Sequence, residues 1–316
     1  MKIAVVGAGS LGLLFAGKLS QIAGEDTLLV THSAEQAALI RKTGISIVED
    51  GSAIFCELDS MPVAELASLA FDYILLMTKQ PHITETLVRS LRQWMGEHTR
   101  LICFQNGIGH IDRLVQSGIP PERIDIAVTT EAARKEAGNR VIHTGKGITS
   151  IGHPQSDGSG SEGESDRLQL LREVFHLSGL SLNRVANIEE MVWNKLIINS
   201  VINPLTAVLH IRNGQLPGSP FFVKLMKALF DEATAVMDRA GLSVSGSLWD
   251  DLLLVCGNTA QNHSSMLQDV IAGKETEIDW INGSLIRLAS EHGVRLPTHE
   301  AVYHMVKGLT DGAHRF

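Results

Sequence analysis

The chain has 316 residues, which at about 100–200 residues per domain predicts two domains. Hydrophobic residues make up 44% and charged residues 20%, which excludes a globally disordered or fibrous protein. The net charge of −8 argues against a general nucleic-acid or anionic-membrane binder, since both need clustered positive charge.

Three well-separated cysteines without a CxxC pair predict a protein of a reducing compartment, with no disulfide framework and no cysteine-rich metal site. The 13 histidines include no HExxH pattern, so we expect no metal. The apolar run at residues 3–6 is too short for a signal peptide, and no apolar stretch approaches the ~20 residues of a membrane span. We therefore expect a cytoplasmic protein that binds neither membranes nor nucleic acids.

The first half alternates short, β-branched apolar runs with helical segments, which is typical of a parallel sheet covered on both faces. The predicted strands are residues 3–6, 27–31, 45–48, 54–58, 73–78, 101–104 and 126–129. The predicted helices between them are residues 11–22, 34–43, 82–95 and 108–117. Asp50-Gly51 predicts a hairpin turn, and residues 144–147 predict a second hairpin between 141–143 and 148–151.

The second half is predicted to be helical. A Gly/Ser-rich segment at 153–166 reads as a surface loop, a helix is expected at about 167–178, and strand-like runs disappear from about residue 187. The later predicted helices are residues 189–209, 220–240, 246–272, 274–292 and 298–309. The fold class is therefore an α/β Rossmann-type domain over 1–186, followed by an all-α domain over 187–316.

A glycine-rich loop follows the first strand directly and opens the first helix. Its pattern is GxGxxG, in which the glycines permit a tight turn, a close approach to a pyrophosphate, and packing of the helix on the strand. The helix N-terminus adds unpaired N–H groups and partial positive charge. The predicted dinucleotide-binding residues are Gly7, Ala8, Gly9, Ser10, Leu11 and Gly12.

The ends of the later strands suggest which dinucleotide binds. No acidic residue follows the second strand, where His32 and Ser33 stand, so a 2′-phosphate is not repelled and NADP(H) is favoured. Lys79 and Asn106 follow two further strands, at the sheet edge where ligands bind in such folds. By position alone, each could equally be a surface or turn residue.

A polar stripe marks the otherwise apolar helix at 189–209. Lys195, Asn199 and Asn203 recur every four residues and so lie on one side of it. A lysine there is costly unless it is paired or faces a cleft, although a lysine extending to the surface is the alternative. Pro204 is expected to kink or interrupt the helix.

At these residues the chain resembles the ketopantoate reductase (2-dehydropantoate 2-reductase) family. Besides the glycine loop, the resemblance rests on the stretches 77–79, 105–109, 141–152, 193–207, 264–269 and 277–283, in the family's order. It implies a helical domain like the C-terminal domain of 6-phosphogluconate dehydrogenase. It also implies NADPH-dependent reduction of ketopantoate to (R)-pantoate, a step of pantothenate and coenzyme A biosynthesis, by a monomer or homodimer.

The resemblance also implies roles for individual residues. Lys195 would be the general acid at the C2 oxygen, and Glu277 would orient the substrate. The acids Glu275 and Asp279 lie close to Glu277, and the residues by themselves do not single out one of the three. The substrate-binding positions implied are Asn106, Asn199, Asn203 and Ser265, and the cofactor-binding positions beyond the loop are His32, Lys79 and Asn106.

Two departures from the family pattern affect these expectations. His32 stands where members commonly have arginine, which softens the preference for NADP(H) over NADH. Glu131 stands where a histidine or neutral residue is usual, and would oppose an anionic substrate unless it is a surface loop residue.

Two other functions stay open: a reductase of another branched 2-oxo acid, and a non-catalytic NADP(H)-binding regulator.

Overall fold

The computed structural model describes residues 1–22, 26–66, 69–154 and 166–311. Most of the Gly/Ser-rich segment expected to form a surface loop lies outside these residues. The chain divides into two compact units, one of Met1–Gln105 and His110–Ile188, the other of Asn106–Gly109 and Glu189–Phe316. The sequence division at 186/187 places residues 106–109 with the first domain. In the structure they join the second unit, where Ile108 N donates to Trp280 O over 3.4 Å.

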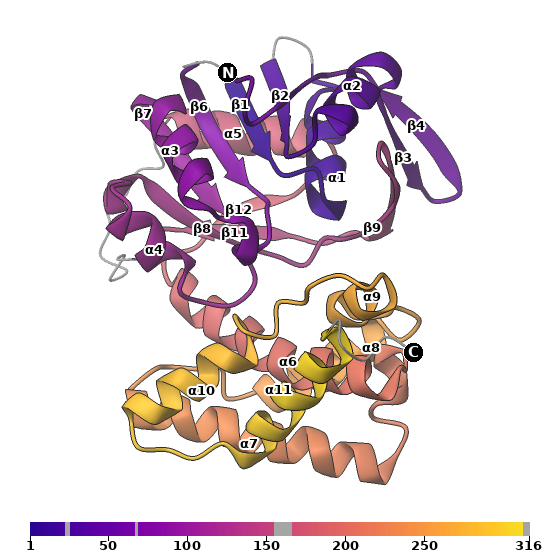
Figure 1. The fold of residues 1–316 in the computed structure, drawn as a ribbon, viewed down its shortest axis with the longest axis vertical. Helices are drawn as coiled ribbons and strands as arrows, with labels where there is room; N and C mark the ends of the chain where they lie inside the picture. The colour runs from indigo at the N-terminus through magenta and orange to yellow at the C-terminus, as the bar shows by residue number, and fades with distance from the viewer. Residues whose placement is uncertain (23–25, 67–68, 155–165, 312–316) are drawn as a thin grey trace. The chain divides into compact units, whose positions relative to one another are not determined.

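The first unit is built on a mostly parallel sheet, as the alternation of apolar runs predicts (Figure 1). Among the described residues its strand order is β12-β11-β8-β7-β6-β1-β2-β5. β11 is antiparallel to β8, and the pairings from β8 to β5 are parallel. The strands are β1 (Lys2–Val6), β2 (Asp26–Thr31), β5 (Asp59–Pro62), β6 (Phe71–Leu76), β7 (Met95–Cys103), β8 (Ile124–Thr129), β11 (Thr149–Gly152) and β12 (Leu182–Arg184).

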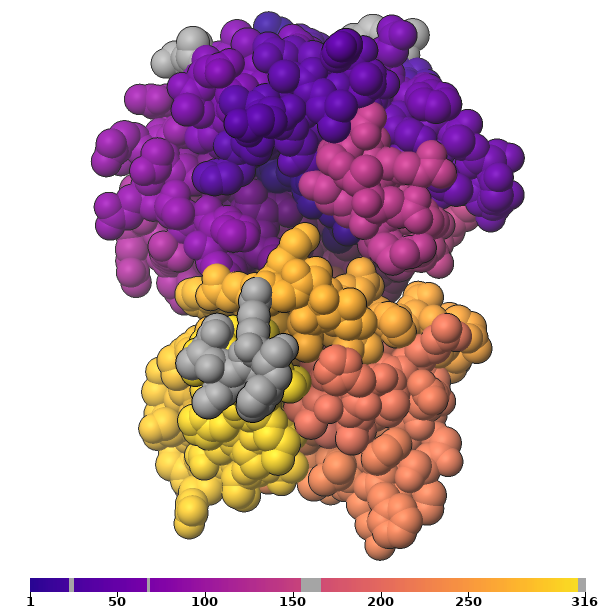
Figure 2. Space-filling model, turned by 45° about the vertical axis from the view of Figure 1, so that its right-hand side comes forward, coloured from indigo at the N-terminus to yellow at the C-terminus, as the bar shows by residue number. Residues whose placement is uncertain are grey.

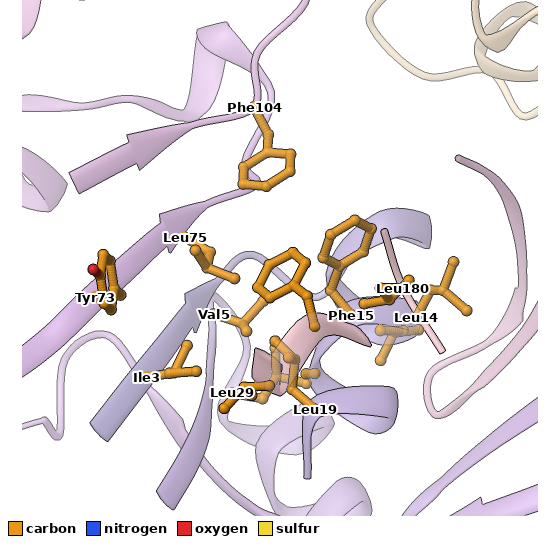
Figure 3. Close-up of a cluster of buried hydrophobic side chains, with 14 of the residues drawn as sticks. Ile3, Val5, Leu14, Phe15, Leu19, Leu29, Tyr73, Leu75, Phe104 and Leu180 are labelled. Atoms are coloured by element: carbon orange, nitrogen blue, oxygen red, sulfur yellow. The ribbon is translucent and has the colours of Figure 1, made fainter. Parts of the chain in front are cut away.

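Both faces of this sheet are buried, because alternate residues of each strand enter different cores. Ile3 and Val5 of β1 pack with helices α1 (Ser10–Leu19) and α5 (Asp166–Leu177), as Figure 3 shows for part of that core. Phe15 of α1 lies edge-on to Phe104 and Phe175, with ring centroids 5.4 and 5.9 Å apart. The intervening residues of β1 pack with α3 (Glu85–Trp94) and α4 (His110–Gln116) on the opposite face. The short 3-10 helices of this unit are η1 (Gln80–His82) and η2 (Pro121–Arg123).

A second, smaller sheet has the order β4-β3-β10-β9. The predicted hairpin at Asp50-Gly51 is confirmed, with positive φ at both residues (51° and 80°), and it joins β3 (Ile45–Glu49) to β4 (Ser52–Cys56). The second predicted hairpin is wrong. β10 (Arg140–Gly145) joins this small sheet, whereas β11 belongs to the large one.

Strand β9 (Ala132–Ala137) is absent from the sequence prediction, because its residues AARKEA lack the apolar pattern of a strand. It pairs with β10 and packs on helix α1. Figure 2 shows this segment, in magenta, against the indigo surface of the same unit. Helix α2 (Ala34–Thr43) forms where it is predicted.

The second unit is helical, as predicted (Figure 1). The sequence predicts a kink or an interruption at Pro204; helix α6 runs through it without a break, so an interruption is wrong. The predictions of two other long helices are also wrong. Residues 246–272 form two helices, α8 and α9, and within 274–292 only Asn282–Glu291 is helical. None of the described helices is long and apolar enough to cross a bilayer. The elements are α6 (Ile188–Leu209), η3 (Asn213–Gln215), α7 (Pro220–Ala240), α8 (Leu248–Asn258), α9 (Ser265–Ile271), α10 (Asn282–Glu291) and α11 (Pro297–Thr310).

Candidate functional site

The glycine loop has the geometry that a pyrophosphate needs. Gly7 has φ of +115°, and a Cβ on it would lie 2.9 Å from Thr78 N. A Cβ on Gly12 would lie 1.7 Å from Gly7 O, so this glycine lets helix α1 pack on the loop. A Cβ on Gly9, the N-cap of α1, would meet nothing within 4 Å. The first and third glycines are therefore required by the fold, and the second leaves open space at the helix N-terminus, where an anion fits.

Two side chains from elsewhere in the first unit hold this loop. Lys135 Nζ donates to Ala8 O over 2.9 Å, and Gln36 Nε2 donates to the same oxygen over 3.2 Å. The backbone N–H of Lys135 donates to Ser10 Oγ over 3.1 Å. Sequence reasoning missed both residues, because β9 and α2 reach the loop only through tertiary packing. Lys135 also places a cation beside the predicted phosphate site.

The end of β2 carries both a possible phosphate contact and a carboxylate. His32 is exposed there, in a position to meet solvent or ligand. Ser33 caps helix α2 by accepting from Gln36 N, and it donates to the Glu35 carboxylate. This bond from Ser33 lowers the pKa of Glu35, so the group is anionic at neutral pH. No acid directly follows β2, as the sequence indicates, but Glu35 in the first turn of α2 places a carboxylate close to this strand end.

The ends of β6 and β7 are joined by a buried amide. Gln105 Nε2 donates to Leu76 O over 2.9 Å and to Thr78 O over 2.8 Å. Within the described part of the chain, Gln105 Oε1 and Thr78 Oγ1 are buried without a hydrogen-bond partner. The partly buried Lys79 follows Thr78 and precedes the short helix η1. This sheet edge therefore holds unused hydrogen-bonding capacity beside the predicted cofactor lysine.

We predict that Gly9→Ala weakens dinucleotide binding while leaving the fold intact. The new methyl group fits the free protein, since nothing lies within 4 Å, but it occupies the space through which a pyrophosphate approaches the N–H groups of α1. Loss of charge-assisted hydrogen bonds should raise the Kd on the order of tenfold to a hundredfold, with Tm unchanged. Titration calorimetry and thermal melts check this. Gly257→Ala on helix α8, also with open space, is the matched control: it should leave the Kd unchanged and should not lower Tm, since alanine favours a helix more than glycine does.

The second unit brings three predicted site residues together. Lys195 stands on α6, and Glu277, 7% exposed, begins the turn before α10. Asn106 Nδ2 donates to Glu277 Oε2 over 3.2 Å. Burial of the ammonium lowers the pKa of Lys195 to about 8, while the Glu277 carboxylate acts in the opposite direction. The group is thus a cation at neutral pH with a pKa suited to giving up a proton.

The structure distinguishes Glu277 from its two acidic neighbours. Glu275 is exposed. Asp279 accepts from Tyr303 Oη over 2.6 Å and from Lys307 Nζ over 2.9 Å, so it serves to hold α11. Of the three acids that the sequence left open, Glu277 is the buried one beside Lys195.

The remaining predicted substrate residues lie on α6 and at the start of α9. Asn199 is half-buried and Asn203 is buried, one and two turns beyond the lysine. Ser265 is the exposed first residue of α9. The preceding Ser264 caps α9 and accepts from Thr206 Oγ1 over 2.7 Å, which ties the start of α9 to α6. Sequence reasoning did not identify this serine–threonine contact.

Glu131 is 7% exposed, so the alternative that it is a surface loop residue is wrong. It is buried in the first unit, with its carboxylate 2.6 Å from His143 Nε2. The other ring nitrogen of His143 lies 3.3 Å from Glu49 Oε1, and Glu49 also contacts Lys18 and Lys146, each over 3.0 Å. Burial raises the pKa of Glu49, but hydrogen bonds from the two lysines outweigh it and hold that pKa at about 2.

A Rossmann-type domain with an open glycine loop and a helical domain with a lysine beside a buried glutamate are typical of oxidoreductases that use a pyridine nucleotide. Residues 3–156 match the family model described as "Ketopantoate reductase PanE/ApbA", and residues 187–310 match its C-terminal model. The chain belongs to this family, and it is an oxidoreductase.

Individual relatives agree with that assignment. The chain is 33% identical to a 2-dehydropantoate 2-reductase of Bacillus subtilis (strain 168), over 98% of this chain and 97% of the relative. Among solved structures, a PanE/ApbA family ketopantoate reductase of Ralstonia eutropha JMP134 is similar at a TM-score of 0.85 and 22% identity, with full coverage of both chains. A D-mandelate dehydrogenase in complex with NADH and anilino(oxo)acetate is similar at 0.87 and 24% identity, again with full coverage. At these identities the two solved structures show the shared fold.

Proposed function

We propose that this protein reduces ketopantoate to (R)-pantoate with NADPH, as a step of pantothenate biosynthesis in the cytoplasm. The observation that carries the proposal is the partly buried Lys195, whose ammonium is desolvated, with Glu277 and Asn106 beside it in the helical domain of a ketopantoate reductase family member. In this proposal residues 1–186 bind the cofactor, and residues 187–316, together with Asn106, provide the substrate-binding and catalytic groups.

The residues of the second unit account for the chemistry other than the hydride. A bound NADPH would supply a hydride to the C2 carbon, which leaves developing negative charge on the C2 oxygen. The Lys195 ammonium stabilises that charge and donates the proton, with a pKa of about 8 that favours transfer near neutral pH. Glu277 accepts from Asn106, and in this proposal its carboxylate also accepts from the substrate hydroxyl. Asn199, Asn203 and Ser265 offer neutral hydrogen bonds for the rest of the substrate.

The pH profile is expected to report Lys195. Because the lysine must be protonated to donate, kcat for reduction should be level below pH 8 and fall as pH rises through about 8. With a lysine of ordinary pKa, kcat would stay level until the pH approaches about 10.4. In Glu277→Gln the carboxylate that raises the pKa is gone, so the fall should begin at lower pH. Initial rates across pH 6–10 with saturating substrates check both statements, and a rate independent of pH up to 10 would contradict them.

The cofactor proposal rests on the absence of an acid directly after β2, where His32 and Ser33 can meet a 2′-phosphate. Glu35 is a specific observation in favour of NADH, because its carboxylate, held by Ser33, can accept from ribose hydroxyls and repel a phosphate. Steady-state rates with each cofactor decide between them. Faster turnover at low NADPH supports the proposal, and faster turnover at low NADH overturns the cofactor part while keeping the reaction. Glu35→Gln should shift the ratio towards NADPH.

The substrate proposal is tested by following oxidation of the reduced cofactor at 340 nm with ketopantoate, pyruvate and 2-oxoisovalerate. Preferred turnover of ketopantoate supports the proposal. Preferred turnover of another acid would make the protein a reductase of a different branched 2-oxo acid. Cofactor binding without turnover across the panel would make it a non-catalytic regulator, a function for which a proton donor has no use.

A further inference from the structure

Helix α6 carries a defect beside the proposed catalytic residues. In an α-helix the carbonyl of Ser200 would accept from the N–H of residue 204, and Pro204 has no N–H. Ser200 is fully buried, so water cannot take the place of that donor. The helix nevertheless continues to Leu209, which requires another donor for this carbonyl.

That donor is Asn282, at the first position of α10. Its Nδ2 lies 2.9 Å from Ser200 O and 3.0 Å from His299 Nδ1, so one amide group serves both acceptors. His299 Nε2 lies 2.9 Å from Leu229 O. Because a carbonyl only accepts, the Nε2 proton is on the imidazole and Nδ1 is free to accept from Asn282. Both Asn282 and His299 are fully buried, and burial keeps the pKa of His299 below its usual value, which matches a neutral ring.

This clamp joins the two segments that carry the proposed chemistry. Ser200 directly follows Asn199, and Lys195 lies less than two turns earlier on the same helix. Asn282 directly follows the turn that begins at Glu277, and Ile281 N donates to Glu277 O over 3.1 Å within that turn. A single side chain therefore ties the lysine helix to the glutamate turn.

Resting on the proposed function, we propose that Asn282 is a positioning residue that holds Glu277 in register with Lys195. It does so by donating to the Ser200 carbonyl, which has no helical donor because of Pro204, and His299 orients its amide. The amide has two tasks that can be separated. It satisfies a buried carbonyl, which any donor could do, and it links two elements, which only a donor on the glutamate turn can do. A misplacement on the order of 1 Å at such a pair costs about a hundredfold in rate.

The test uses the same substitution in two backgrounds. Asn282→Ala alone should lower both the urea midpoint and kcat, the latter on the order of ten- to a hundredfold. Pro204→Ala supplies the helical N–H for Ser200 O. In this single variant the carbonyl oxygen can accept from both that N–H and Asn282, because it has two lone pairs. In the double variant the urea midpoint should recover most of its loss, whereas kcat should stay low because the link to the glutamate turn is still missing.

A second readout does not need turnover. NMR titration of protein labelled with ¹³C at the lysine ε-carbons, with the Lys195 signal assigned from Lys195→Arg, follows the lysine itself. Since Glu277 raises the pKa of Lys195, a displaced Glu277 should lower that pKa in Asn282→Ala and in the double variant alike. His299→Gln, whose amide can both accept and donate, should retain more activity than His299→Leu.

Recovery of kcat together with the urea midpoint in the double variant would overturn the proposal and leave Asn282 a structural role only. An unchanged Lys195 titration in Asn282→Ala would overturn it as well. Failure of the unmodified protein to reduce any 2-oxo acid would instead refute the proposed function, while the urea and NMR measurements would still decide the role of Asn282.

Discussion

Lys195→Ala is expected to lower kcat for ketopantoate reduction by about 10²–10⁴, the usual contribution of a positioned general acid. Hydride addition places negative charge on the substrate oxygen, and the variant leaves no cation in place of the Lys195 ammonium. The glycine loop and its supporting residues belong to the first unit, so the affinity for the cofactor should not change. Single-turnover rates and cofactor titrations measure the two quantities separately.

Lys224→Ala is the control for this experiment, because Lys224 is an exposed lysine on α7 of the same unit. It should leave kcat unchanged. If Lys195→Ala keeps near-normal turnover, the proton comes from another group and the proposed mechanism is wrong.

Lys195→Arg retains the charge but holds its proton more tightly, so it should stabilise the oxygen yet remain slow in proton transfer.

Glu131→Ala is expected to lower the free energy of unfolding of the first unit by about 1–3 kcal/mol, the usual cost of leaving a buried hydrogen-bonding group without its partner. The Glu131 carboxylate is 2.6 Å from His143 Nε2, and the two residues are 7% and 8% exposed. Without the carboxylate, Nε2 of His143 loses its hydrogen-bond partner, and water has little access to replace it. Urea unfolding followed by circular dichroism measures the loss.

Glu136→Ala is the matched control, since Glu136 pairs with Arg134 and Arg140 on the same small sheet but is about one-third exposed. Surface pairs of this kind contribute at most about 1 kcal/mol. Similar losses in the two variants would mean that burial adds nothing to the Glu131 pair. A large rise in affinity for an anionic substrate in Glu131→Ala would mean that the carboxylate faces the substrate.

Much of the first domain follows from local pattern, because a strand buried on both faces must be apolar throughout. Residues 3–6 illustrate this: alternate side chains enter the two cores, and the run leads directly into the glycine loop. The sequence predictions are wrong where this local pattern gives no signal. Strand β9 is half-exposed and reads as a polar segment, and residues 148–151 pair with β8 of the large sheet, a choice that no local signal indicates.

For the candidate site, the sequence by itself determined the glycine loop and the Lys195, Asn199 and Asn203 stripe, because both depend on backbone geometry over a few residues. Only the tertiary structure decided which acid accompanies the lysine, since Glu275, Glu277 and Asp279 differ in burial and partners and not in local sequence. It likewise decided that Glu131 pairs with His143, that Lys135 reaches the loop, and that Asn282 donates to Ser200. Each of these joins residues far apart in the chain, and their pairing depends on how sheets and helices pack, which short-range spacing does not encode.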